Sequence, residues 1–228
     1  MPNIWETPIY RLRSLTGKPV LIDVTSSVKP GLPPNMAINA FINLLREKQL
    51  EKVVDFGAGE LRHTFPLLDA GFQVCAVEYE EQFKKETCAQ ALRRAEKDAN
   101  FSKLIWPKDF IADKRRFDAA LLSYVLQTMP VQGEREYVLE LLGEKLYRDG
   151  YLLYMSRFNQ MEGTHYSHKV ADGFYKWPER EHHSFYRECT TEETHELMDN
   201  FDFRRIRSLS ERGTDQIFVY AKGKGTWI

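Results

Sequence analysis

Short apolar segments alternate with amphipathic segments along most of this chain. The clearest apolar segments are 52–56, 72–78, 117–125 and 151–158, and segments with the apolar spacing of helices lie between them. Such alternation is typical of βαβ units, in which a helix joins two parallel strands. Right-handed crossovers leave few ways to connect such units. The pattern therefore predicts an α/β fold built on a mostly parallel sheet.

The last part of the chain has a different pattern. A helix is predicted at 191–201, opened by Thr190 or Thr191, and two strands near 203–209 and 215–221 follow it. The short turn between these strands predicts a hairpin, so the last strand should run antiparallel to its neighbour. Together with a strand near 103–106, we expect a seven-stranded, mostly parallel sheet with an antiparallel last strand in a three-layer α/β/α sandwich.

Composition limits the classes of partner and compartment. The chain has 228 residues, 43% of them hydrophobic, which fits a single globular domain. Its 32 basic and 33 acidic residues give a net charge of −1, so there is no global attraction to nucleic acid or to an anionic membrane. The three cysteines form no Cys-x-x-Cys pair, and no apolar run approaches the roughly 18 residues of a membrane helix. We expect a cytoplasmic protein without a membrane segment.

The first strand-to-helix turn carries the main candidate for a ligand site. Gly57, Ala58 and Gly59 follow the strand 52–56, and glycines at such a turn let the backbone approach a ligand closely. Glu78 ends the next strand, where a carboxylate can accept hydrogen bonds from both hydroxyls of a ribose. These two features predict a nucleoside-containing ligand.

Two further residues discriminate between nucleotide ligands. A dinucleotide turn has the form Gly-x-Gly-x-x-Gly, but Arg62 stands at its sixth position here. Asp55, at the end of the strand, would repel a pyrophosphate and suits a cationic ligand better. S-adenosylmethionine carries an ammonium and a sulfonium group. A nicotinamide-dependent oxidoreductase is therefore disfavoured.

Several segments together resemble class I S-adenosylmethionine-dependent methyltransferases. VVDFGAGELRHTFPLLDAGFQVCAVEYEEQF looks like their opening, and FDAALLSYVLQTMP looks like their fourth strand and its loop. LYRDGYLLYMSR and FYRECTTEETHELMDNFDFRRIRSL look like the fifth strand and the closing elements of their sheets. The resemblance spans roughly 36–222 and implies a Rossmann-like fold, bound S-adenosylmethionine and S-adenosylhomocysteine as product.

The resemblance implies a set of cofactor-binding positions. The amino-acid part of the cofactor would lie at the glycine turn, its ribose at Glu78, its adenine beside an acid and an apolar residue, and its methyl group beside the end of the fourth strand. The implied residues are Asp55, Gly57, Ala58, Gly59, Glu78, Tyr79, Asp109, Phe110, Ser123 and Tyr124. Asp109 could equally be an ordinary loop acid. Leu61 stands where the family often has a third glycine, and its side chain could narrow the cofactor site.

The sequence defines the binding site of the methyl acceptor less closely than that of the cofactor. Methyl transfer from a sulfonium needs mainly positioning, and a base is needed only if the acceptor must lose a proton. The insertion 158–188 is rich in aromatic residues and histidines and is expected to cap an acceptor pocket. His165 and Tyr166 are the first candidates for a base, with Tyr124 as a further catalytic candidate. The histidines lack a completing ligand, so no metal site is expected.

These inferences give one domain over 1–228. We expect an N-terminal extension or lid (1–35), a cofactor-binding core (36–157), the substrate cap (158–188), and a closing helix and hairpin (189–228). A small-molecule acceptor is the default. Nucleic acid is a possible but less favoured acceptor, because the fourth strand does not end in Asp/Asn-Pro-Pro-Tyr. A non-catalytic S-adenosylmethionine-binding protein is the other alternative. The sequence gives no oligomeric state.

Overall fold

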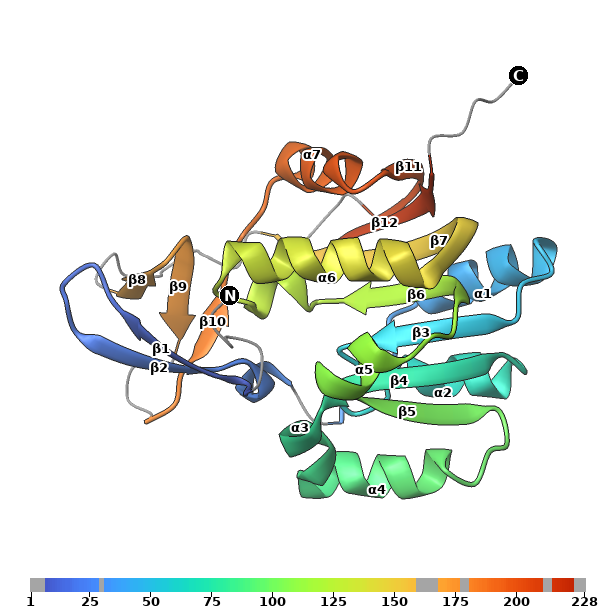
Figure 1. Cartoon of the computed structure of the whole chain (residues 1–228), viewed down its shortest axis with the longest axis horizontal. Helices are drawn as coiled ribbons and strands as arrows, with labels where there is room; N and C mark the ends of the chain where they lie inside the picture. Colours follow the sequence, from blue (N-terminus) through green and yellow to red (C-terminus); the bar gives the residue numbers. More distant parts are fainter. Residues whose placement is uncertain (1–6, 29–30, 159–167, 177–180, 211–214, 224–228) are drawn as a thin grey trace.

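A seven-stranded sheet forms the centre of the molecule (Figure 1). The computed structural model describes residues 7–28, 31–158, 168–176, 181–210 and 215–223. Along the sheet the strands are β11 (Phe203–Ser210), β12 (Asp215–Lys222), β7 (Leu146–Arg157), β6 (Phe117–Ser123), β3 (Lys52–Phe56), β4 (Gln73–Tyr79) and β5 (Phe101–Trp106). The strands from β7 to β5 are parallel, and β12 is antiparallel to both of its neighbours. The predicted sheet with its antiparallel last strand is confirmed.

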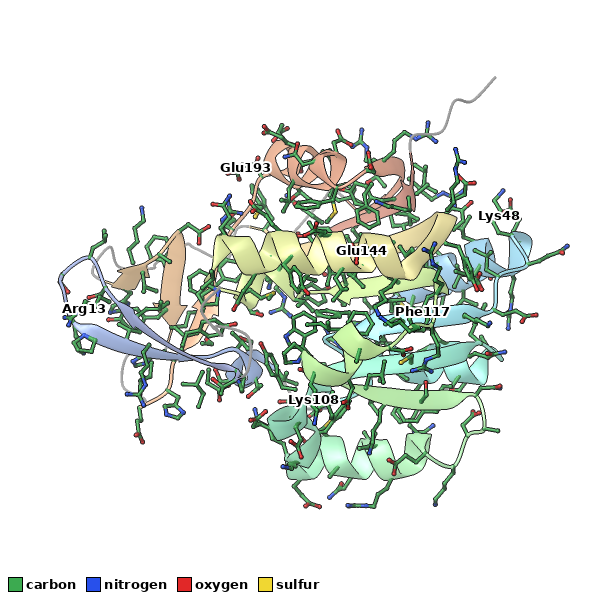
Figure 2. The ribbon with its side chains drawn as sticks, in the orientation of Figure 1. Arg13, Lys48, Lys108, Phe117, Glu144 and Glu193 are labelled. Carbon is green, nitrogen blue, oxygen red and sulfur yellow. The ribbon has the colours of Figure 1, made fainter. Side chains whose placement is uncertain are left out.

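Helices cover both faces of this sheet. One layer holds α1 (Ala37–Glu47), α2 (Thr64–Asp69), α3 (Glu80–Lys84) and α4 (Glu86–Ala95), and the other holds α5 (Lys108–Ala112), α6 (Gln132–Lys145) and α7 (Thr191–Asn200). Each layer packs its apolar side chains against one face of the sheet, so two separate hydrophobic clusters lie on either side of it. Figure 2 shows side chains filling both spaces. The predicted three-layer α/β/α, Rossmann-like sandwich is therefore confirmed.

The sequence of residues 80–98 has the apolar spacing of one long helix. The structure divides it into α3 and α4 at Lys85, whose backbone is extended, with φ −62° and ψ 138°. The Lys85 ammonium group donates hydrogen bonds to Thr25, in a distant part of the chain. The break follows from this tertiary contact, which overrides the helical spacing of the sequence.

Residues 148–150 have the turn-like sequence Arg-Asp-Gly but lie inside β7. The pairing of β7 with β6 shifts from Phe117–Leu146 to Ala119–Tyr151, so β7 carries a wide bulge there. Asp149 takes a left-handed φ of 68° in this bulge. The N-cap of α7 is Thr190, one of the two residues predicted to open this helix, and its side chain and that of Glu193 form a capping box.

The N-terminal hairpin and the insertion after β7 form one unit beside the sheet (Figure 1). The hairpin consists of β1 (Ile9–Arg13) and β2 (Pro19–Asp23), and the insertion adds the three-stranded sheet of β8 (Lys169–Val170), β9 (Gly173–Lys176) and β10 (Ser184–Tyr186). Backbone hydrogen bonds join β2 to His183. We call β1, β2 and β8–β10 the cap.

The cap has a small hydrophobic cluster of its own. Tyr10, Val20 and Ile22 of the hairpin pack against Val170, Tyr175 and Phe185 of the insertion, and all six are buried. The short 3-10 helix η1 (Val24–Ser27) leads from β2 back toward the sheet. None of the described helices has the length and apolar character needed to cross a lipid bilayer.

Candidate active site

A cavity lies between the cap and the carboxyl ends of the parallel strands. The ends of the five parallel strands β3 to β7 contribute to its wall, and the cap and η1 cover it. The lining residues used below are Thr25, Ser27, Val28, Gly57, Ala58, Gly59, Arg62, His63, Glu78, Tyr79, Trp106, Ser123, Tyr124, Val125, Arg157 and Tyr186. In open parallel sheets, ligands bind at this edge of the sheet.

The glycine turn after β3 gives the cavity its closest backbone approach. The Gly57 and Ala58 amides donate hydrogen bonds to the Val77 carbonyl at 2.9 and 3.2 Å, which fixes the turn against β4. Gly57 has a φ of 71°, and a Cβ added there would lie 2.3 Å from a methyl group of Val125. Only glycine satisfies both the left-handed backbone and this contact.

Glu78 joins the glycine turn to the end of β4. Its carboxylate accepts hydrogen bonds from the Gly59 amide at 3.0 Å and from the amide of the next residue, Tyr79, at 2.8 Å. The side chain is buried, and burial raises the pKa of this carboxyl group to about 7. Each carboxylate oxygen has lone pairs left to accept a hydrogen bond from a ligand in the cavity.

Trp106, at the end of β5, forms the wall of the cavity beyond Glu78. Its ring packs edge-on against Phe56, with the ring centroids 4.9 Å apart. The sequence predictions missed this residue, although its position as the last residue of an apolar segment was a usable signal. Its aromatic side chain offers a surface on which a flat heterocycle can stack.

The η1 segment covers the cavity above the glycine turn. Its start is fixed by Asp23, whose carboxylate accepts hydrogen bonds from the Thr25 amide and hydroxyl at 2.9 and 2.7 Å. The Ser27 hydroxyl at the cavity is buried and has no hydrogen-bond partner among the residues that the structure describes. A buried hydroxyl of this kind can bond a ligand that enters the cavity.

Tyr124 lies at the end of β6 between two arginines. The guanidinium carbons of Arg62 and Arg157 each lie 5.3 Å from the centre of its ring. Its hydroxyl accepts a hydrogen bond from the Asn35 side chain at 3.0 Å. Burial raises the pKa of the Tyr124 hydroxyl, so it stays protonated at neutral pH.

Comparison with known proteins gives the arrangement a precedent. No protein-family model and no curated protein match this sequence. Among solved structures, a methyltransferase of Methanosarcina mazei described as S-adenosylmethionine-dependent superposes with a TM-score of 0.62 at 15% identity, covering 84% of this chain and 99% of that one. A 1,6-didemethyltoxoflavin N1-methyltransferase of Burkholderia thailandensis, with bound 1,6-didemethyltoxoflavin and S-adenosylhomocysteine, gives 0.60 at 19% identity, covering 83% and 79%. The fold is that of class I S-adenosylmethionine-dependent methyltransferases.

A third solved structure has the same fold. The magnesium protoporphyrin IX methyltransferase of Synechocystis, with bound S-adenosylhomocysteine, superposes with a TM-score of 0.57 at 14% identity and covers 82% of each chain. The methyltransferase fold expected from the sequence is thus confirmed, and the seven-stranded sheet places the glycine turn, Glu78 and Tyr124 around one cavity.

Three residues expected to contact the cofactor do not line this cavity. Asp55 is 1% exposed and accepts a hydrogen bond from the Thr64 hydroxyl at 2.7 Å, while burial raises its pKa to about 6. Asp109 accepts a hydrogen bond from the Ile105 amide at 3.3 Å, and Phe110 is fully buried behind Trp106. Asp55 lies inside β3, and Asp109 and Phe110 lie in α5 after Trp106, so these side chains support the cavity wall from behind.

Leu61, where this methyltransferase fold often has a third glycine, leaves the cavity open. Its φ is 62°, in the region that glycine prefers, but its side chain is fully buried in the core on the α1 side of the sheet. The expected narrowing of the cofactor site is therefore wrong, because the side chain points away from the ligand. The left-handed backbone explains why glycine is common at this position.

His63 is a cavity residue that sequence reasoning did not select. Its Nε2 accepts a hydrogen bond from the Asn35 amide at 3.2 Å, and burial lowers its pKa to about 3. The ring is thus neutral, and the hydrogen bond to its Nε2 fixes the segment before α1. His165 and Tyr166 lie outside the described residues. No group of three metal-ligating side chains occurs in the described part of the chain.

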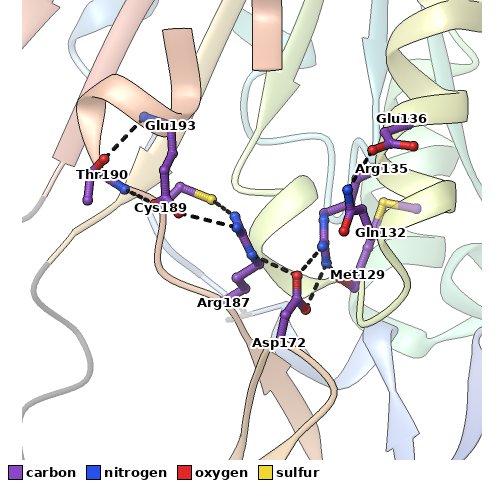
Figure 3. A network of polar contacts seen from close by, with 9 residues as sticks. All are labelled: Met129, Gln132, Arg135, Glu136, Asp172, Arg187, Cys189, Thr190 and Glu193. Carbon is purple, nitrogen blue, oxygen red and sulfur yellow. Dashed lines mark hydrogen bonds and ion pairs between the residues drawn. The ribbon is translucent and has the colours of Figure 1, made fainter. Parts of the chain in front are cut away.

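A polar network holds the cap against α6 and α7 of the three-layer core (Figure 3). The Asp172 carboxylate, in the β8–β9 turn, accepts from Arg135 of α6 and from Arg187, whose Nε lies 2.8 Å away. Arg187 in turn contacts Glu193 at 3.6 Å in the first turn of α7. The Arg135 side chain is only 4% exposed, so this buried charge depends on Asp172 for its partner.

Proposed function

We propose that this chain is an S-adenosylmethionine-dependent methyltransferase that acts on a small-molecule acceptor. The observation that carries the proposal is Glu78, a buried carboxylate bonded to the Gly59 amide at the mouth of the cavity. A carboxylate in this position can accept hydrogen bonds from two vicinal hydroxyls, which is the geometry that a ribose offers.

The surrounding residues fit the rest of the cofactor. The glycine turn admits the amino-acid part, Trp106 offers its ring to adenine, and the partnerless Ser27 hydroxyl supplies a further polar contact. Bound S-adenosylmethionine supplies an activated methyl group on a sulfonium. The chain's own task is to orient the two reactants and exclude water, because such a displacement depends chiefly on positioning.

The covered cavity favours a small acceptor over nucleic acid. The cap and η1 contribute residues to its wall, so an acceptor must fit beneath them. The toxoflavin precursor and magnesium protoporphyrin named with two of the neighbours are small molecules as well. The net charge of −1 also gives no general attraction to a polyanion. We place this reaction in the cytoplasm, as the unpaired cysteines Cys75, Cys88 and Cys189 suggest.

Tyr124 is proposed to position the reactants. Its raised pKa keeps the hydroxyl protonated, so it serves as a hydrogen-bond donor to an acceptor atom and not as a base. Ser123 beside it donates to the Met155 sulfur at 3.4 Å, which leaves its oxygen free to accept. His165 and Tyr166 remain the proposed bases for an acceptor that must lose a proton.

Calorimetric titration with S-adenosylmethionine and S-adenosylhomocysteine tests the cofactor. We expect micromolar binding that Glu78→Ala loses and that Glu80→Ala, an exposed acid two residues further on, retains. Absence of binding by the wild-type protein, or equal binding by Glu78→Ala, would contradict the proposal. Release of S-adenosylhomocysteine with an acceptor then separates an enzyme from a non-catalytic S-adenosylmethionine-binding protein.

A further inference from the structure

Two arginines lie together on one aromatic ring inside the cavity. Arg62 follows the glycine turn of β3, and Arg157 ends β7, yet both guanidinium groups contact the Tyr124 ring. Their positive charges repel one another, and this repulsion adds to burial in lowering the pKa of Arg62. Two half-buried like charges beside the same ring create a local preference for an anion.

The described carboxylates leave this charge only partly balanced. Neither arginine forms an ion pair within 4.0 Å with a carboxylate that the structure describes. Asp215 of β12 lies opposite Arg157 of β7 in the sheet register. Its negative charge favours higher pKa values of Arg62 and Tyr124. The buried Asp55 carboxylate also acts on Arg62 but is bonded to Thr64. An oxyanion in the cavity would give both arginines a direct partner.

Arg157 is held in place by its backbone. Its amide donates to the Gln127 side chain at 2.7 Å, and its carbonyl accepts from the Tyr186 hydroxyl at 2.7 Å. Gln127 follows β6 and Tyr186 ends β10 of the cap, so the position of Arg157 depends on both the core and the cap. A guanidinium whose main chain is fixed in this way loses less freedom when it binds a ligand.

The location of the pair points to the acceptor side of the cavity. Glu78 and Trp106 lie at β4 and β5, whereas Tyr124 and Arg157 lie at β6 and β7, on the other side of the glycine turn of β3. Beyond Arg157 the cavity wall passes to the cap through Tyr186. A ligand group at Arg157 is therefore separated along the sheet from the proposed ribose and adenine positions.

We propose that Arg62 and Arg157 bind a carboxylate of the methyl acceptor beside the Tyr124 ring, an inference that rests on the proposed methyltransferase function. Two guanidinium groups that reach the same part of the cavity match the two oxygens of a carboxylate. The preferred substrates are accordingly carboxylic acids, and their neutral amides are poor ones.

Binding to protein saturated with S-adenosylhomocysteine tests the inference without a known acceptor. Benzoate is the probe, and benzamide is its neutral counterpart of the same shape. We expect benzoate to bind about tenfold more tightly than benzamide, and Arg157→Gln and Arg62→Gln each to abolish this preference. The control is Arg148→Gln, the same substitution at the exposed opposite end of β7. Equal binding of the two probes, or an unchanged preference in both cavity variants, would overturn the inference.

The cofactor's own carboxylate is the other possible source of the anion, and a second titration separates the two. If the arginines serve the acceptor, Arg157→Gln should bind S-adenosylhomocysteine within about twofold of the wild-type affinity. If Arg157→Gln weakens S-adenosylhomocysteine about tenfold but leaves 5′-methylthioadenosine, which lacks the amino-acid part, unaffected, the pair holds the cofactor and the inference is wrong. Failure of the wild-type protein to bind S-adenosylhomocysteine would overturn the proposed function itself, and this inference with it.

Discussion

Lys85 and Thr25 are 60 residues apart in the chain and are joined by two hydrogen bonds. The Lys85 ammonium donates to the Thr25 carbonyl at 2.9 Å and to its hydroxyl at 2.7 Å. Thr25 belongs to η1, which covers the cavity, and Lys85 is the residue at which α3 ends and α4 begins. The contact thus ties the cover of the proposed cofactor site to the helices that follow β4, which carries Glu78.

Removal of this ammonium group should loosen the cover. Lys85→Met keeps the length of the side chain but loses both hydrogen bonds, so we expect S-adenosylhomocysteine to dissociate about fivefold faster, as measured by stopped-flow fluorescence. Lys84→Met is the matched control, because the neighbouring lysine is exposed and pairs with Glu80 on its own helix. Equal dissociation rates in the two variants would show that η1 does not retain the ligand.

A methyl group at Gly57 should damage the turn more than one at Gly17. Both glycines have a left-handed φ, 71° and 81°, but an added Cβ meets Val125 at 2.3 Å only at Gly57. Gly17→Ala should lower the free energy of unfolding by about 1–2 kcal/mol, and Gly57→Ala by a further 1–3 kcal/mol, roughly. Urea denaturation measures both. Adding Val125→Ala should recover part of the extra loss, and failure to do so would refute the steric explanation.

Ligand affinity should depend on the protonation of Glu78. Burial raises the pKa of the Glu78 carboxyl group to about 7. Ribose hydroxyls donate stronger hydrogen bonds to the ionised carboxylate than to its protonated form. Below pH 7 the free protein must lose this proton before it binds, so the affinity for S-adenosylhomocysteine should rise about tenfold from pH 6 to pH 8. Titrations of Glu78→Gln should give a weaker but flat profile. A slope that persists in this variant would assign the titration to another group, such as Asp55.

Breaking the polar network at Asp172 should release the cap before the core unfolds. Asp172→Asn leaves the buried Arg135 guanidinium without its carboxylate, which should cost about 1–3 kcal/mol of unfolding free energy. Hydrogen exchange of the β9 amides should accelerate more than that of β3. Asp113→Asn, which breaks an ion pair of 2.7 Å with Arg115 away from the cap, provides the control. Uniform acceleration in both strands would contradict a separate opening of the cap.

The fold was predictable because its signals are local. The apolar segments, the Gly57 turn and the acid at the end of β4 each show within a few residues of sequence, and the known handedness of βαβ units then limits the topology. The hairpin of β11 and β12 follows from its short connection in the same way. Glu78 could be selected because a strand end and a spacing from the glycines define its position.

The rest of the site depends on contacts between distant segments. Arg157 and Trp106 reach the cavity only because β5 and β7 lie at particular places in the sheet, and η1 reaches it through Lys85. The hydrophobic periodicity of the sequence does not predict such contacts between distant segments. The same reason explains the broken helix at Lys85, and it explains why Asp109 and Phe110 were chosen in place of Trp106, which stands just before them.

The shared core of the cap has a consequence for the order in which the protein can assemble. Residues 9–23 are made early, but a two-stranded hairpin is marginally stable alone, and the apolar side chains of Tyr10 and Ile22 have no cover until β8–β10 are synthesised. The central strands β3 to β6 can pair before that point. The half of the sheet that carries Glu78 can therefore form before the cap is complete, because the early hairpin meets its partner strands more than a hundred residues later in the chain.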